Sequence, residues 1–147
     1  MAPNLNWVET QFDQVLAVHR GQIDTAKLLT TFATGISATV LATALQTLPK
    51  VTSTVRASAY LLALSVFLAI VVMVLDRLRV ADHEYLQMEA WRSSWTDDEF
   101  VFALRRAILI AASENRVVAT IVKGTAVIQI AIALSSGFLA SVALLRK

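Results

Sequence analysis

Residues 28–48 read LLTTFATGISATVLATALQTL, a run of 21 residues without a charged side chain. Two more uncharged runs follow, ASAYLLALSVFLAIVVMVL at residues 57–75 and GTAVIQIAIALSSGFLASVALL at residues 124–145. A helix rises about 1.5 Å per residue, so each run is long enough to cross a hydrocarbon core of about 30 Å. The three runs therefore predict three transmembrane helices.

The composition of the chain agrees with a membrane protein. Of its 147 residues, 56% are hydrophobic and 16% are charged, whereas soluble domains have about 45–50% apolar and about 25% charged residues. A soluble core of three buried helices is the alternative, but so short a chain has too little polar sequence to cover them. We expect an all-α, integral membrane helical bundle, in which residues 1–147 form a single membrane domain.

The sequence carries none of the common signatures of catalysis. There is no cysteine, no glycine-rich phosphate loop, no Gly-x-Ser-x-Gly elbow and no zinc-protease helix. His19 and His83 have no partner at metal-ligand spacing, and a net charge of +2 does not suggest a nucleic-acid polymer as partner. We expect no enzyme, no catalytic residue, no metal site and no cofactor.

The distribution of basic residues predicts the orientation of the spans. Three spans place the two termini on opposite sides, and the amino-terminal segment shares its side with residues 76–123. Nine of the 13 basic residues lie on that shared side. The positive-inside rule then places the amino terminus in the cytoplasm and the carboxyl terminus outside. The nine are Arg20, Lys27, Arg77, Arg79, Arg92, Arg105, Arg106, Arg116 and Lys123.

Two amphipathic helices are expected on the cytoplasmic side. The first covers residues 7–27, after a capping pair of Asn6 and Glu9, and no strong breaker stops it from continuing into the first span. The second follows Thr96 and Glu99, a capping box that predicts a helix starting at Asp97. It is free to continue into the last span. We expect the two helices to pack on each other.

The first span carries small and hydroxyl side chains on one face. Thr31, Gly35, Thr39 and Thr43 recur every four residues, which aligns them along a helix. Such a face serves close helix packing, within the chain or between subunits. The alternative is a hydroxyl-lined path through an oligomer. No charged residue lies within any span, which disfavours a proton relay.

Five charged residues are candidates for holding an anionic ligand. Arginine forks suit phosphate groups, although basic residues near a membrane also anchor helices at anionic headgroups. Asp24 and Lys27 lie three residues apart just before the first span, where they form a surface pair or reach the second amphipathic helix. The candidates are Asp24, Lys27, Arg105, Arg106 and Arg116.

Two tryptophans near the second amphipathic helix have two interpretations. The amphipathic rings of Trp91 and Trp95 suit a membrane interface. Aromatic faces also stack on nucleobases. The residues around them do not favour one interpretation over the other.

Two short motifs and the order of the elements resemble a known family. The motifs are Asp24-Thr25-Ala26-Lys27-Leu28-Leu29, and Tyr85 followed by Trp95-Thr96-Asp97-Asp98-Glu99. Together with a tight two-span hairpin and a last span, they resemble the transmembrane effectors of Pycsar antiphage systems. The resemblance covers nearly the whole chain.

The resemblance implies an oligomeric effector in the bacterial inner membrane. Such an effector responds to a cyclic pyrimidine nucleotide, cyclic CMP or cyclic UMP, made by a partner cyclase, and then impairs membrane integrity. The five charged candidates would form the sensing layer and the Thr31–Thr43 face would rearrange. The alternatives are a related small membrane effector triggered by another nucleotide signal or by a protein, and a non-conducting membrane scaffold.

Overall fold

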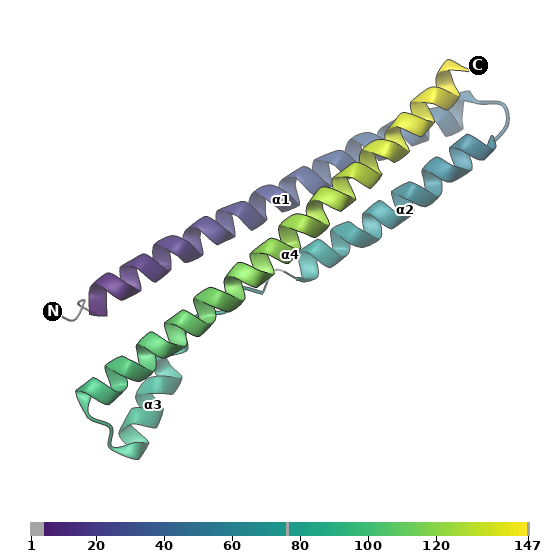
Figure 1. Ribbon diagram of the computed structural model, residues 1–147. Helices are drawn as coiled ribbons and strands as arrows, with labels where there is room; N and C mark the ends of the chain where they lie inside the picture. The colour runs from purple at the N-terminus through teal and green to yellow at the C-terminus, as the bar shows by residue number, and fades with distance from the viewer. Residues whose placement is uncertain (1–4, 76, 147) are drawn as a thin grey trace. The chain divides into compact units, whose positions relative to one another are not determined.

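The computed structural model describes residues 5–75 and 77–146, apart from the side chains of residues 5–9 and 83. All regular structure in this part of the chain is helical (Figure 1). The helices are α1 (Leu5–Thr47), α2 (Ser53–Val74), α3 (His83–Ser93) and α4 (Asp97–Leu145). Because α1, α2 and α4 are each long and apolar enough to cross a membrane, the predicted all-α fold with three spanning helices is confirmed.

Two of the helices are longer than the spans that they contain. The amphipathic segment of residues 7–27 and the first span form one helix, α1, and α4 runs from Asp97 to Leu145 without interruption. Both amphipathic helices, whose continuation the sequence left open, are therefore continuous with a span. The capping prediction at Asn6 is wrong, because α1 already includes Leu5.

Side-chain caps set the starts of the other helices. The Thr52 hydroxyl accepts a hydrogen bond from the Val55 N–H at the start of α2, and the Asp82 carboxylate accepts one from the Tyr85 N–H at the start of α3. Each cap satisfies a backbone donor that the first helical turn leaves unpaired. α3 ends at Ser93, and the capping residue Ser94 that follows adopts a left-handed conformation with φ of 51°.

The capping box of α4 forms as its sequence predicts. Glu99 Oε2 accepts hydrogen bonds from the Thr96 N–H, at 2.8 Å, and from the Thr96 hydroxyl, at 2.9 Å. In return, the Thr96 hydroxyl accepts one from the Glu99 N–H. This reciprocal pair fixes the start of α4 at Asp97.

Close contacts divide the described residues into two units. The first unit contains residues up to Gln22 and Arg77–Thr120, and the second contains residues from Ile23 to 75 and from Ile121 onward. Since α1 and α4 both extend across these limits, each contributes to both units.

The first unit has a small apolar core that joins the two amphipathic helices. Phe12 of α1 is buried with Leu104, Ile108 and Ala111 of α4, and Leu86 of α3 packs against them. The three α4 residues are spaced by four and by three, so they lie on one side of the helix. The expected packing of the amphipathic helices on each other is confirmed.

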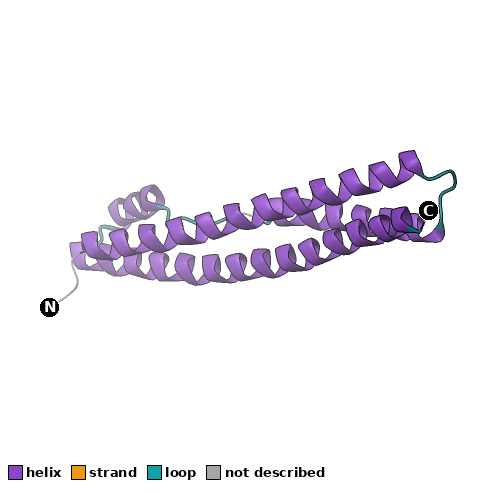
Figure 2. Cartoon of the chain, turned by 90° about the horizontal axis from the view of Figure 1, so that it is seen from above, coloured by secondary structure: helices purple, strands orange, loops and turns teal. Residues whose placement is uncertain are grey.

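The second unit is a bundle in which α4 contacts both α1 and α2. An apolar cluster joins the three helices: Leu41 and Ala44 of α1, Val55 of α2, and Ala140 and Ala143 of α4. A short loop connects α1 to α2 (Figure 2). Large apolar side chains cover the outside of the bundle, as expected for a surface in contact with lipid.

Candidate functional site

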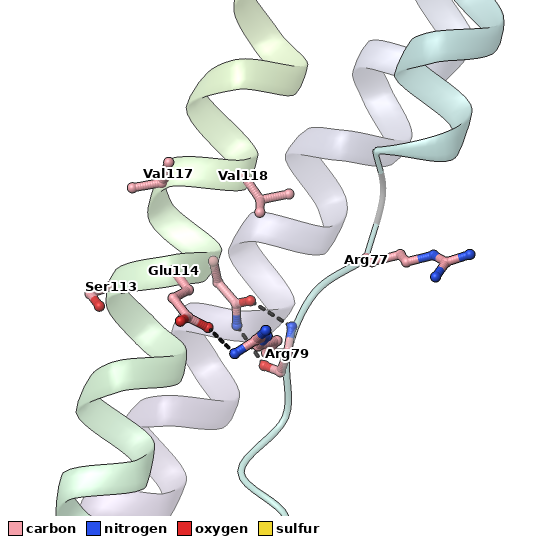
Figure 3. A pocket seen from close by; sticks show the side chains of 7 residues that line it. Arg77, Arg79, Ser113, Glu114, Val117 and Val118 are labelled. Atoms are coloured by element: carbon pink, nitrogen blue, oxygen red, sulfur yellow. Dashed lines mark hydrogen bonds and ion pairs between the residues drawn. The ribbon is translucent and has the colours of Figure 1, made fainter.

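A pocket in the first unit combines charged and apolar side chains beside α4 (Figure 3). Its volume is about 400 Å³, within the range of about 300–1,000 Å³ that small-molecule sites usually have. One wall is the segment between α2 and α3, and the other is α4. The lining residues are Arg77, Arg79, Ser113, Glu114, Asn115, Val117 and Val118.

Asn115 holds the segment between α2 and α3 against α4. Its side chain is only 1% exposed. The amide Nδ2 donates a hydrogen bond to the Arg79 carbonyl, and Oδ1 accepts one from the Arg79 N–H, both at 2.7 Å. A primary amide matches a peptide unit in this way because it offers one donor and one acceptor side by side. The clamp positions Arg79 at the pocket.

The two arginines at the pocket, Arg77 and Arg79, differ in their surroundings. Arg79 Nη1 lies 2.9 Å from Glu114 Oε2, so this pair is balanced, while Arg77 is exposed and directed away from Arg79 (Figure 3). Because the Arg79 and Glu114 side chains are 73% and 42% exposed, their ion pair contributes little to stability. An anion can therefore compete with Glu114 for the Arg79 guanidinium.

The predicted ligand residues lie elsewhere. Arg105 is half-buried, whereas Arg106 and Arg116 are exposed, and all three belong to the first unit. Glu114 is about 180° around α4 from Arg105, at 100° per residue. Arg105 is therefore on the opposite side of α4 from the Glu114 carboxylate, and none of the three arginines lines the pocket.

The other two predicted ligand residues belong to the second unit. Asp24 is exposed and Lys27 is half-buried, one turn apart on α1. The five candidates are thus divided between the two units, and their grouping into one sensing layer stays a prediction.

Sequence reasoning gave no role to Asn115, although a signal for it exists. Asn115 continues the buried side of α4 that Leu104, Ile108 and Ala111 define, four residues after Ala111. A lone amide at such a position needs a hydrogen-bond partner. The partner could not be read from the sequence, because Arg79 lies 36 residues away and outside any helix.

The threonine face of the first span is not the packing face of the chain. Thr31, Gly35, Thr39 and Thr43 are all exposed, and the three hydroxyls donate to backbone carbonyls of their own helix. Packing within the chain is therefore the wrong interpretation for this face. Contact between copies, or a path through an oligomer, stays a prediction.

A neighbouring face of α1 makes the contact with α4. Ser37 is buried, and its hydroxyl donates to the Ala133 carbonyl at 2.6 Å. A Cβ added to Gly137 would lie 3.2 Å from Ser37 Oγ, so a glycine at this position permits the close approach. Ala133 and Gly137, both buried, are therefore the α4 side of this contact.

Comparison of the chain with protein-family models, curated proteins and solved structures finds no match.

Proposed function

We propose that this chain is an oligomeric effector of a bacterial antiphage signalling system. A cyclic pyrimidine nucleotide, cyclic CMP or cyclic UMP from a partner cyclase, binds the first unit, and the second unit then impairs the integrity of the inner membrane. The protein performs no chemistry of its own and needs no cofactor. The basic residues favour a cytoplasmic first unit and amino terminus, with the carboxyl terminus outside.

The Arg79 pocket is the observation that carries this proposal. The phosphate of a cyclic nucleotide bears one negative charge and accepts a bidentate guanidinium. Arg79 is held at the pocket through its backbone by Asn115, so its side chain can leave Glu114 without loss of the clamp. Val117 and Val118 supply apolar wall for a base. The pocket thus fits a small anion that has an apolar portion.

One helix, α4, connects the proposed nucleotide site to a span. α4 carries Glu114 and Asn115 and continues as the last spanning helix. Binding shifts a bundle between two packings only when the ligand has a different affinity for each. A nucleotide that separates Arg79 from Glu114 would bind more tightly to a packing in which the two side chains are apart than to the packing in which they are paired.

Calorimetry and vesicle leakage test the proposal together. The purified full chain is titrated with cyclic CMP, cyclic UMP, cyclic AMP, cyclic GMP and cyclic oligonucleotides, and the same nucleotides are added to vesicles that contain the protein and an entrapped dye. We expect binding and dye release with a pyrimidine nucleotide only. Vesicles that stay sealed at saturating cyclic CMP and cyclic UMP would refute the proposal. Release by cyclic oligonucleotides instead would indicate a related effector with another signal.

The exposed face of α3 favours a second candidate, a non-conducting membrane scaffold. Tyr85, Met88 and Trp91 are 61%, 68% and 87% exposed, and contiguous exposed apolar groups often mark a surface for a protein partner. For a scaffold, Trp91→Ala should abolish function while Thr39→Leu leaves it intact. The effector proposal expects the reverse.

A further inference from the structure

The interior of the second unit is polar where its exterior is apolar. Fully buried polar side chains come from all three helices of this unit, and half-buried Thr34 joins them. On the outside, Phe32, Phe67 and Phe138 are all more than half exposed. We call the inner group the polar seam. It consists of Thr30, Thr34, Ser37, Ser58, Ser65, Gln129 and Ser136.

Hydrogen bonds within the polar seam connect the three helices. The Ser136 hydroxyl donates to the Ser58 carbonyl at 2.7 Å, and the Ser58 hydroxyl donates to the Ser136 carbonyl at 2.8 Å, which joins α2 to α4. The bond from Ser37 to the Ala133 carbonyl joins α1 to α4. Serine contacts of this kind allow close approach of helices, and they can be exchanged for water because each hydroxyl both donates and accepts.

Gln129 lies at one end of the polar seam with half of its amide unsatisfied. Its Nε2 donates to Thr34 Oγ1 at 2.7 Å and to Ser65 Oγ at 2.8 Å, so it bridges α1 and α2. Its Oε1 is buried and accepts no hydrogen bond from the described residues. A buried carbonyl oxygen without a donor raises the free energy of the closed packing. Access of water to Oε1 would relieve this cost.

An apolar cluster closes the polar seam beyond Ser136. Leu41, Val55 and Ala140 are packed together there, and apolar constrictions keep water out of a pore by dewetting. From Gln129 to Ser136 the seam extends about 10 Å along α4, at about 1.5 Å per residue. The second unit therefore has a polar interior, and a water-excluding apolar cluster lies at one end of it.

We propose that the polar seam is the route that fills with water when the protein permeabilises the membrane, and that Gln129 favours its opening. This inference rests on the proposed function for its trigger, since a cyclic nucleotide would only shift the balance between the closed and hydrated seams. It assigns the path to the interior of each bundle. The exposed threonine face of α1 is then a lipid or subunit contact.

Cysteine accessibility tests the proposal, because the natural chain has no cysteine. Single variants Ser136→Cys, Ser135→Cys and Thr39→Cys are placed in vesicles and treated with a charged methanethiosulfonate, which reacts with thiolates in water. Ser135 is the matched control, since it is exposed and its hydroxyl bonds only to the Ala131 carbonyl of its own helix. Circular dichroism and gel filtration check that each variant folds.

The expected result without nucleotide is slow labelling of Ser136→Cys and none of Ser135→Cys. Adding Gln129→Leu should slow the labelling of Ser136→Cys by about tenfold, because leucine removes the unsatisfied oxygen from the closed state. A nucleotide that releases dye should speed the same labelling. Labelling of Thr39→Cys in place of Ser136→Cys, or no effect of Gln129→Leu, would overturn the proposal.

The same experiment separates the two proposals. Labelling of Ser136→Cys that depends on Gln129, with no response to cyclic CMP or cyclic UMP, would refute the nucleotide-triggered function and leave the hydrated seam standing. A second variant does not rely on labelling. Val55→Thr, which puts a hydroxyl into the apolar closure, should leak dye without nucleotide, whereas Val66→Thr on the exposed side of α2 should not. Sealed vesicles with Val55→Thr would count against the seam.

Discussion

The side-chain amide of Asn115 pairs with the backbone of Arg79 as one strand pairs with another, through two hydrogen bonds of 2.7 Å. Residues 77–82, which precede α3, form no helix, so this clamp satisfies backbone groups that would otherwise need water. The clamp also places the Arg79 guanidinium beside Glu114.

Loss of the Asn115 amide should loosen the segment that it holds. Asn115→Leu keeps the branched shape of the side chain and removes both hydrogen bonds, with an expected cost of about 1–3 kcal/mol for the backbone groups left unpaired. Hydrogen exchange followed by mass spectrometry should show faster exchange in residues 77–82. Ser113→Ala, at an exposed position in the same pocket, is the control. Equal protection in Asn115→Leu and the natural chain would contradict the clamp.

The Arg79 pocket makes opposite predictions for its two charges. Arg79→Gln should weaken binding of cyclic CMP or cyclic UMP about tenfold or more, because a charge-assisted contact is lost. Glu114→Gln should strengthen binding, since it removes the competitor for Arg79. Calorimetry measures both, and Arg92→Gln, exposed on α3 and outside the pocket, is the control. Loss of affinity in Arg105→Gln but not in Arg79→Gln would place the ligand at the arginines singled out from the sequence.

The capping box of α4 should weaken in acid. Hydrogen bonds from the Thr96 N–H and then from its hydroxyl hold the pKa of Glu99 below its ordinary value. Because the folded pKa is the lower one, the stabilisation is complete above the unfolded value of about 4.3 and disappears as the pH falls through the folded pKa. Carboxyl carbon NMR should show this low pKa. Thr96→Val should raise it, and Thr120→Val should not.

The two glycines of α4 should respond differently to the same substitution. Gly137→Leu places side-chain atoms against Ser37 and should cost about 1–3 kcal/mol by overpacking. At Gly124 an added Cβ meets nothing within 4 Å, so Gly124→Leu should keep the gain in helix propensity of about 1 kcal/mol. Thermal unfolding in detergent compares the two. An equal shift in both variants would argue against close packing at Gly137.

The exposed threonine face should matter for contacts between copies and not for the fold of one chain. Thr39→Leu should leave helix content unchanged, because Thr39 is exposed and its hydroxyl bonds only to the Gly35 carbonyl of α1. It should shift the mass measured by light scattering in detergent if copies meet at this face. Ala63→Leu, exposed on α2 and so outside this face, is the control. The same mass for both variants would remove this face from any oligomer contact.

Only part of the candidate site could be predicted from the sequence. The sequence predicts an anion site that includes Arg105, Arg106 and Arg116 of α4 and leaves out Arg77 and Arg79. Nothing local distinguishes Arg79 from Arg105 or Arg116. What distinguishes Arg79 is its contact with Asn115 and Glu114, more than 30 residues away.

The sequence by itself determined the three spanning helices and the start of α4, because the signals that form them are local, whereas α3 was not predicted. Hydropathy over about 20 residues marks a span, and the Thr96–Glu99 pair starts α4 through atoms three residues apart. The tertiary structure decided which sides of those helices meet. Ser37 and not Thr39 packs on Gly137. Both hydroxyls lie within hydrogen-bond distance of a carbonyl of their own helix, so the shape of the facing helix selects between them.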